Sequence, residues 1–155
     1  MSKAGPHDPA FLERLMRLQR TGGRGAVGLV LGDFAASCGF NHFAYHVVRR
    51  PAPAPAPDDL HTYPGRWIRH YDQQGYARLD APLVLAGREV LAFRWETAIA
   101  RSGITPVQQR IFEEARDFGV GDGVTLPCHG PGGGLAVISF ARPVLSARES
   151  FAEGR

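Results

Sequence analysis

Three aromatic residues recur at a spacing of four in the middle of the chain: Tyr63, Trp67 and Tyr71. Residues four apart lie on one face of a helix, so this segment predicts an aromatic face. Asp80 and Trp95 follow within the next twenty-four residues. An indole N–H can only donate a hydrogen bond, and an ionised carboxylate can only accept one. The cluster could therefore bind a small molecule that offers both an acceptor and a donor.

The same spacing also has a purely structural interpretation. In a protein of unknown fold, aromatic residues at helical spacing are more often part of a core than of a ligand site. Asp80 taken alone would be an ordinary loop acid or a helix cap. The residue types therefore permit a binding site without requiring one.

Residues that could support catalysis or bind a metal ion are poorly arranged. Cys128 and His129 are neighbours on a predicted strand, so their side chains point to opposite faces and cannot act together. His42 and His46 would lie about 13 Å apart along a strand, too far to share one metal ion. The glycines between residues 119 and 134 lack the Gly-Lys-Ser/Thr sequence of a phosphate-binding loop. We predict no catalytic residues, no metal site and no cofactor, which favours a binding module over an enzyme.

The composition is that of an ordinary globular domain. The chain has 155 residues, of which 44% are apolar and 21% charged, enough for one core and too few for two independent domains. No apolar run approaches the roughly eighteen residues of a membrane span, and residues 1–10 lack an apolar signal-peptide core. Cys38 and Cys128 form no disulfide-dense or CxxC pattern and are expected to be buried thiols. We expect a cytoplasmic protein without a membrane partner.

The first fifty residues predict two helices and a strand. Apolar residues at helical spacing predict a first helix from Asp8 to Gly23. The apolar run from Ala26 to Cys38 predicts a buried helix that ends at Gly39. Residues 40–49 alternate in a way typical of a strand, with one face that carries Phe43, Tyr45 and Val47.

The proline-alanine run from Pro51 to Pro57 cannot lie inside a helix or a sheet, because prolines lack the amide donor. It could be a linker between domains or a stiff surface loop within one. We favour the loop, because the residues before it already end in a strand that needs partners.

Further elements are predicted beyond this loop. Tyr63 to Gln74 predicts a helix that ends at Gly75, and Leu91 to Trp95 a short strand. Thr105 to Gln108 has the pattern of a capping box with proline at the first helical position, so a helix should run from there to Gly119. Its expected buried stripe consists of Val107, Ile111, Ala115 and Phe118.

The last third of the chain predicts a hairpin. Gly123 to His129 and Leu135 to Ala141 are strand-like segments joined by the glycine-rich turn from Gly130 to Gly134. A second capping box at Ser146 begins a helix that the last nine residues are too short to complete. Helices on both sides of a mainly antiparallel sheet predict an α+β fold, a three-layer α/β/α sandwich.

The segment from Tyr63 to Asp80, with Trp95-Glu96 after it, resembles the autoinducer-binding domain of LuxR-type quorum-sensing transcription factors, and the LasR-like members in particular. The resemblance continues through Phe112-Glu-Glu-Ala115, Gly123-Val-Thr-Leu-Pro127 and Leu135 to Ser139, and covers roughly residues 8 to 141. It implies a PAS/GAF-like fold with a five-stranded sheet, so that residues 1–155 form one sensor domain.

The resemblance also implies a ligand, an N-acyl homoserine lactone. This molecule has a lactone carbonyl, an amide N–H, an amide carbonyl and an alkyl tail, so its site needs a donor, an acceptor, a second donor and apolar walls. The indole of Trp67 suits the lactone carbonyl, and the carboxylate of Asp80 suits the amide N–H. A mispaired ligand would leave such groups buried without partners, at a cost of about 1–3 kcal/mol each.

Other site residues are implied by the resemblance alone. Tyr63 and Ser139 would bind the amide carbonyl, Tyr71 would pack on the acyl chain, and Trp95 would form a wall beside the lactone. The remaining pocket residues are expected to be Phe93, Ala115, Val120 and Val137.

The sequence departs from the LasR-like pattern directly after Asp80. Where that pattern has proline and then threonine, this chain has Ala81-Pro82, which removes a hydroxyl near the ligand head group. An alternative therefore stays open, in which the chain is an orphan or truncated member that binds another signal or acts by protein dimerisation.

Members of the family dimerise and carry a C-terminal helix-turn-helix domain that binds DNA. The net charge of +3 comes from scattered arginines, and residues 1–155 predict no DNA-binding helix. We therefore expect a homodimer that binds DNA only through a domain absent from this chain. We further expect the domain to be truncated before its last helix and to depend for stability on its ligand or on a partner chain.

Overall fold

A five-stranded sheet forms the centre of the molecule. The computed structural model describes residues 23–51 and 59–144, together with four single positions before them, and its strand order is β2-β1-β5-β4-β3. Each pair of neighbours in this order is antiparallel. The strands are β1 (His42–Arg49), β2 (Leu60–His61), β3 (Phe93–Arg94), β4 (Asp122–His129) and β5 (Leu135–Arg142).

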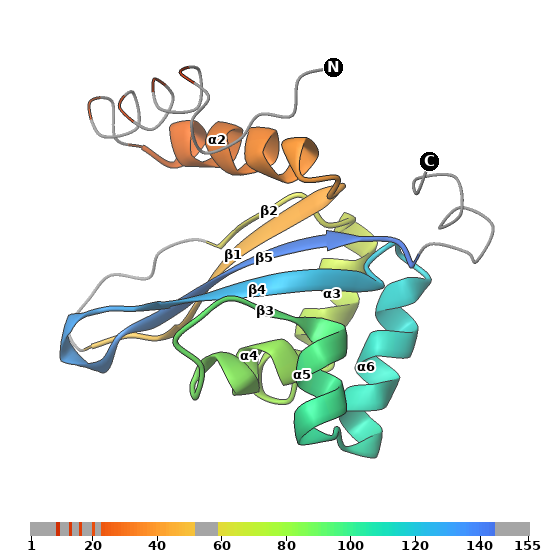
Figure 1. Cartoon of the computed structure of the whole chain (residues 1–155). Coiled ribbons are helices and arrows are strands. Elements are labelled where there is room, and N and C mark those ends of the chain that lie inside the picture. Colours follow the sequence, from red (N-terminus) through yellow and green to blue (C-terminus); the bar gives the residue numbers. More distant parts are fainter. Residues whose placement is uncertain are drawn as a thin grey trace.

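Helices cover both faces of this sheet (Figure 1). Helix α2 (Arg24–Ser37) lies over one face, and a layer of further helices lies against the other. The predicted three-layer α+β sandwich is confirmed. The second layer contains α3 (Gly65–Gln73), the 3-10 turn η1 (Tyr76–Arg78), α4 (Ala81–Ala86), α5 (Trp95–Ser102) and α6 (Pro106–Arg116).

An apolar cluster packs on each face of the sheet, and the two differ in size. The smaller cluster lies between α2 and the sheet and consists of Ala35, Phe43 and Phe140, with partly buried neighbours. The larger one lies between the sheet and helices α3 to α6, and its largest side chains are Trp67, Trp95, Tyr76, Phe93 and Phe112. The main core therefore lies on the side of α3 to α6.

Helix α2 is less buried than its sequence predicts. Ala35 is buried, whereas Leu29 is 74% exposed. A helix that is apolar on all sides and packs on a sheet through one side leaves the other side uncovered by that contact. Its end is as predicted, because Gly39 has a φ of 81° and its N–H donates to the carbonyl of Ala36.

Both cysteines are exposed, so the prediction of buried thiols is wrong. Cys38 directly follows α2, and Cys128 is the second-last residue of β4. Both therefore lie at the end of an element, where the core no longer covers side chains.

The elements of the last third agree closely with the sequence patterns. Strands β4 and β5 pair without interruption from Asp122 opposite Arg142 to His129 opposite Leu135. The capping box of α6 is present: the Thr105 hydroxyl accepts a hydrogen bond from the Gln108 N–H, and the Gln108 side chain accepts one from the Thr105 N–H. In the predicted apolar stripe, Ile111 and Ala115 are buried and Phe118 is half-buried, but Val107 is exposed and Phe112 is buried instead.

Three predicted segments lie outside the described residues: the helix from Asp8, apart from four single helical positions, the proline-alanine loop over residues 52–58, and the helix from Ser146. The strands on either side of that loop, β1 and β2, pair with each other. The loop therefore connects neighbours in one sheet. Within the described part of the chain, no helix has both the length and the apolarity to cross a membrane.

Candidate ligand-binding site

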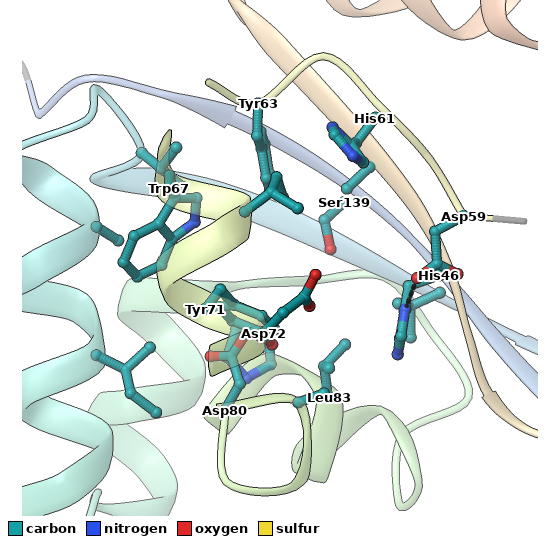
Figure 2. Close-up of a pocket in the computed structure, with 18 of the residues that line it drawn as sticks. His46, Asp59, His61, Tyr63, Trp67, Tyr71, Asp72, Asp80, Leu83 and Ser139 are labelled. Atoms are coloured by element: carbon teal, nitrogen blue, oxygen red, sulfur yellow. Dashed lines mark hydrogen bonds and ion pairs between the residues drawn. The ribbon is translucent and has the colours of Figure 1, made fainter. Parts of the chain in front are cut away.

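A cavity of about 230 Å³ lies between the sheet and helices α3 to α6. A space of this size exceeds what one or two buried waters need. Most of the predicted site residues lie on its wall (Figure 2). These are Tyr63, Trp67, Tyr71, Asp80, Trp95, Ala115, Val120, Val137 and Ser139. Phe93 is the exception, because it packs within the main core on β3, off the cavity wall.

The aromatic cluster comes from α3 and the residues just before it. Trp67 and Tyr71 are one helical turn apart on α3, and Tyr63 precedes the helix by two residues. The rings of Trp67 and Tyr71 meet edge to face, with centroids 5.7 Å apart. Gly75 ends this segment with a φ of 65°, a left-handed conformation that glycine adopts at low cost. The aromatic face that the spacing predicts is therefore a wall of the cavity.

Trp67 offers an unused hydrogen-bond donor in this wall. Its side chain is only 3% exposed. Every fully covered side-chain nitrogen or oxygen among the described residues has a hydrogen-bond partner, yet no described residue accepts a bond from the Trp67 indole. The indole N–H must then border open space, and the cavity is the space that Trp67 lines.

Asp80 faces the cavity although it occupies the N-cap position of α4. An N-cap aspartate usually accepts a bond from the backbone N–H of the second or third helical residue. Here the second residue is Pro82, which has no N–H, and the Asp80 side chain makes no cap bond. The hydroxyl of Tyr71 donates to its Oδ2 over 2.8 Å instead. One carboxylate oxygen thus holds Tyr71, and the other is available to a ligand.

The electrostatics of this cluster follow from burial. Loss of contact with bulk water raises the pKa of Asp80 to about 6, although the bond from Tyr71 and the charge of His46 act in the opposite direction. Burial, and then the negative charge of Asp80, also raise the pKa of Tyr63 and of Tyr71 well above the ordinary tyrosine value. Both phenols therefore stay protonated and can donate hydrogen bonds.

A buried chain of hydrogen bonds crosses the sheet beside the cavity. The indole N–H of Trp95 donates to the Thr125 hydroxyl over 2.9 Å, and that hydroxyl lies 2.8 Å from the Ser139 hydroxyl. Trp95 therefore has no donor left for a ligand and can serve only as an apolar wall. Thr125 is fully buried. The sequence did not predict a role for it at the site, because it has no feature that separates it from other strand residues.

Gly123 permits the position of Trp95. A Cβ atom at this residue would lie 2.7 Å from the Trp95 ring and 2.6 Å from the Phe140 carbonyl oxygen. Both distances are far below contact distance, so only glycine fits on β4 where the indole crosses it.

Helices α3 and α6 are joined by a further interaction that sequence reasoning missed. Oε2 of Glu114 accepts hydrogen bonds from the Tyr76 hydroxyl and from Nε2 of His70, each over 2.7 Å. The bond from Tyr76, with a smaller effect of His70, lowers the pKa of Glu114. Glu114 lies 44 and 38 positions from His70 and Tyr76, and the three residues have no characteristic spacing.

Strand β1 also contributes residues to the cavity that were not assigned to it from sequence. Ala44 and His46 line it, together with Asp59 and His61 from the β2 segment and Asp72 from α3. The alternation of β1 offered a usable signal for Ala44 and His46, because Phe43 on the opposite face packs against α2. Tyr45 also lines the cavity and does not follow this alternation.

Comparisons with known proteins agree with this geometry. The family model described as "Autoinducer binding domain" matches residues 24–152. The chain belongs to the autoinducer-binding domain family. It is thus the autoinducer-binding sensor domain of a LuxR-type regulator, a family of transcription regulators and not of enzymes. Within the family, the HTH-type quorum-sensing regulator RhlR of Pseudomonas aeruginosa is 34% identical over 106 residues, which are 67% of this chain and 42% of that protein.

A second relative gives a similar picture. The transcriptional activator SolR of Ralstonia nicotianae is 32% identical over 113 residues, which are 70% of this chain and 46% of that protein. The chain therefore spans less than half the length of these curated relatives.

Solved structures of autoinducer-binding domains share the fold. CepR2 of Burkholderia cenocepacia, described as an N-acylhomoserine lactone dependent LuxR family factor, superposes with a TM-score of 0.70 at 22% identity, over 92% of this chain and 82% of that chain. SdiA in complex with octanoyl-rac-glycerol superposes with a TM-score of 0.68 at 22% identity, over 94% of this chain and 60% of that chain. This likeness shows the fold alone.

Proposed function

We propose that this domain senses an N-acyl homoserine lactone. In this proposal Trp67 donates to the lactone carbonyl, and Asp80 accepts from the amide N–H. Tyr63 and Ser139 bind the amide carbonyl, Tyr71 packs on the acyl chain, and the ring of Trp95 forms a wall beside the lactone. Ala115, Val120 and Val137 supply apolar surface.

The observation that carries the proposal is the pair of unused polar groups in one cavity. The Trp67 indole N–H has no acceptor among the described residues, and one carboxylate oxygen of Asp80 has no donor. A ligand with a carbonyl and an N–H satisfies both, whereas a plain hydrocarbon leaves both without partners, at a cost of about 1–3 kcal/mol for each group.

Isothermal titration with N-octanoyl homoserine lactone tests the proposal. Trp67→Phe and Asp80→Asn should each weaken binding by about tenfold or more while the far-ultraviolet circular dichroism stays unchanged. Asp117→Asn is the matched control, because Asp117 is exposed at the end of α6, away from the cavity. Equal affinity in wild type and in both cavity variants would refute the assigned roles.

A second candidate is an acyl ligand without a lactone ring. Pro82 lines the cavity next to Asp80 and brings no hydroxyl to the head group. SdiA, which shares the fold, has been solved with octanoyl-rac-glycerol. Mass spectrometry of small molecules extracted from the purified protein distinguishes the two, because recovery of a non-lactone acyl compound would favour this candidate.

The wider role follows from the relatives. We propose that the protein acts in the cytoplasm as a homodimer and reaches DNA through a helix-turn-helix domain outside residues 1–155. The relatives' printed names, which include transcriptional activators and HTH-type regulators, support this role. Light scattering of the purified chain with and without ligand tests the dimer, and a monomer under both conditions would contradict it.

A further inference from the structure

The cavity has polar groups at two separate places. Trp67 and Tyr71 lie on one side, whereas His46 and Asp59 lie on the opposite side, next to the sheet (Figure 2). Asp72 also lines the cavity. We call His46, Asp59 and Asp72 the rim cluster, because all three line the cavity and none is buried, whereas Trp67 is almost fully covered. His46 and Asp59 come from the sheet side, with side chains 30% and 43% exposed, and the exposed Asp72 comes from α3.

The ring of His46 is held in one orientation. Its Nδ1 donates to Oδ2 of Asp59 over 2.6 Å. The backbone N–H of Val47 donates to Oδ1 of Asp59, and the guanidinium of Arg24 donates to the Asp59 carbonyl. The other ring nitrogen, Nε2, has no partner among the described residues, and Figure 2 shows it on the side of the ring away from Asp59. This nitrogen is a fixed polar group at the cavity.

The sheet register fixes how far His46 of the rim cluster lies from Ser139, one of the proposed head-group residues. Ala44 pairs with Ser139 and His46 with Val137, so His46 is one strand across and two residues along from Ser139. Strand geometry puts the Cα atoms of His46 and Ser139 about 8 Å apart. A ligand whose amide carbonyl lies at Ser139 therefore reaches His46 with a part of its tail several carbons from the amide.

The charges of the rim cluster restrict the chemistry of that part of the tail. The carboxylates of Asp59 and Asp72 disfavour an anionic group, so a fatty acid or another carboxylate fits poorly. A hydroxyl fits either state of the ring, because it can donate to a neutral Nε2 and accept from a protonated one. When the ring is protonated, the same hydroxyl can accept from Nε2 and donate its single proton to the Asp72 carboxylate, which has no hydrogen-bond partner among the described residues.

We propose that the ligand of this cavity carries a hydroxyl group on the distal part of its acyl tail, bound by His46 and Asp72. This inference rests on the proposed function, since it extends the same cavity from the head group to the tail. It assigns His46 as a residue that determines specificity, with Asp59 as the residue that positions it.

A matched set of ligands tests the inference. Affinities for N-octanoyl homoserine lactone and for its 3-hydroxy and 8-hydroxy derivatives are measured by isothermal titration in wild type, His46→Leu and Asp72→Asn. The 8-hydroxy compound should bind wild type about tenfold more tightly than the unsubstituted one, and the 3-hydroxy compound should show no such gain. His46→Leu should abolish the gain and Asp72→Asn should reduce it.

His129→Leu is the matched control, because it makes the same change at a sheet histidine that does not line the cavity. It should keep the tenfold gain. Equal binding of the three lactones to wild type, or a gain that survives in His46→Leu, overturns the inference and leaves the proposed function intact. If none of the three lactones binds, the proposed function fails and this inference fails with it.

Discussion

The position of the Asp80 carboxylate depends on a backbone amide that α4 lacks. Pro82 removes one of the amides that an N-cap aspartate would bind, so the carboxylate turns to Tyr71 and the cavity. The charged form gains little from water there, and the pKa rises to about 6. The proposed role of Asp80 in ligand binding and its contribution to stability therefore oppose each other.

The raised pKa of Asp80 predicts a pH-dependent cost. The folded state binds this proton more tightly than the unfolded state, so the contribution of Asp80 to stability is greatest at low pH and falls as pH rises from about 4 to about 6. Asp80→Asn keeps a bond from Tyr71 and removes the charge. It should leave the melting temperature of the ligand-free protein unchanged near pH 4 and raise it at pH 7.5. The corresponding gain in unfolding free energy at pH 7.5 is up to about 3 kcal/mol.

Thermal melts of wild type and variant at both pH values provide the measurement. If the melting temperatures of wild type and Asp80→Asn differ equally at pH 4 and pH 7.5, the charge of Asp80 does not lower stability.

Gly123 gives a prediction about the wall formed by Trp95. Gly123→Ala places a methyl group against the indole and the Phe140 carbonyl, and should destabilise the domain by about 1–3 kcal/mol. Gly130→Ala is the control, because the nearest atom to a Cβ there is 3.9 Å away and its φ is −113°. Urea unfolding measures both variants, and equal midpoints would show that Trp95 can move at no cost.

At the scale of elements, Glu114 holds α3 and η1 against α6. Two hydrogen bonds converge on one carboxylate oxygen of Glu114, whose side chain is 32% exposed. Since α3 carries Trp67 and Tyr71, this contact fixes the distance between the aromatic wall and the helix opposite it.

Glu114→Gln should therefore lower stability by about 1–2 kcal/mol at pH 7. The lowered pKa means that this stabilisation is present above the ordinary glutamate value and is lost as pH falls through the folded-state value. Glu113→Gln, at an exposed neighbour that bonds only Gln109 among the described residues, should change little. Chemical unfolding at pH 7 and at pH 3 measures both, and a Glu114→Gln effect that persists unchanged at pH 3 would contradict the ionic explanation.

The elements that the sequence predicts are those with a local signal. The capping box at Thr105 and the turn before Leu135 mark α6 and the β4–β5 hairpin with little ambiguity. Helices α4 and α5 were missed because they have only six and eight residues and neither has a side-chain cap. The exposure of α2 was missed because composition does not tell how many elements cover a helix.

The residues around the cavity also divide into those with a local sequence signal and those without one. Tyr63, Trp67 and Tyr71 have a regular spacing, and the resemblance to a known family adds Asp80 and Ser139. Thr125 and Glu114 have no such pattern, because they act through partners 14 to 44 positions away. Such contacts depend on the register of the sheet and the packing of helices, which local patterns do not encode.

At the scale of the whole molecule, the cavity is a gap in the main core, so a ligand that fills it should stabilise the fold. A ligand at one hundred times its dissociation constant adds about 2.7 kcal/mol. For a domain of this size, that corresponds to a rise in melting temperature of roughly 5–10 °C. Differential scanning calorimetry with saturating N-octanoyl homoserine lactone measures it, and an unchanged midpoint would show that the ligand does not bind the folded state.

The pairing of β1 with β5 brings together residues from the two ends of the described chain, such as Ala44 and Ser139. Both belong to the cavity wall. Because a ribosome makes the chain from its N-terminus, β1 can pair early with β2 but must wait for almost one hundred further residues before its other partner, β5, exists. A nascent chain that stops before β5 has no complete pocket, so the domain can respond to its signal only after this strand has been made.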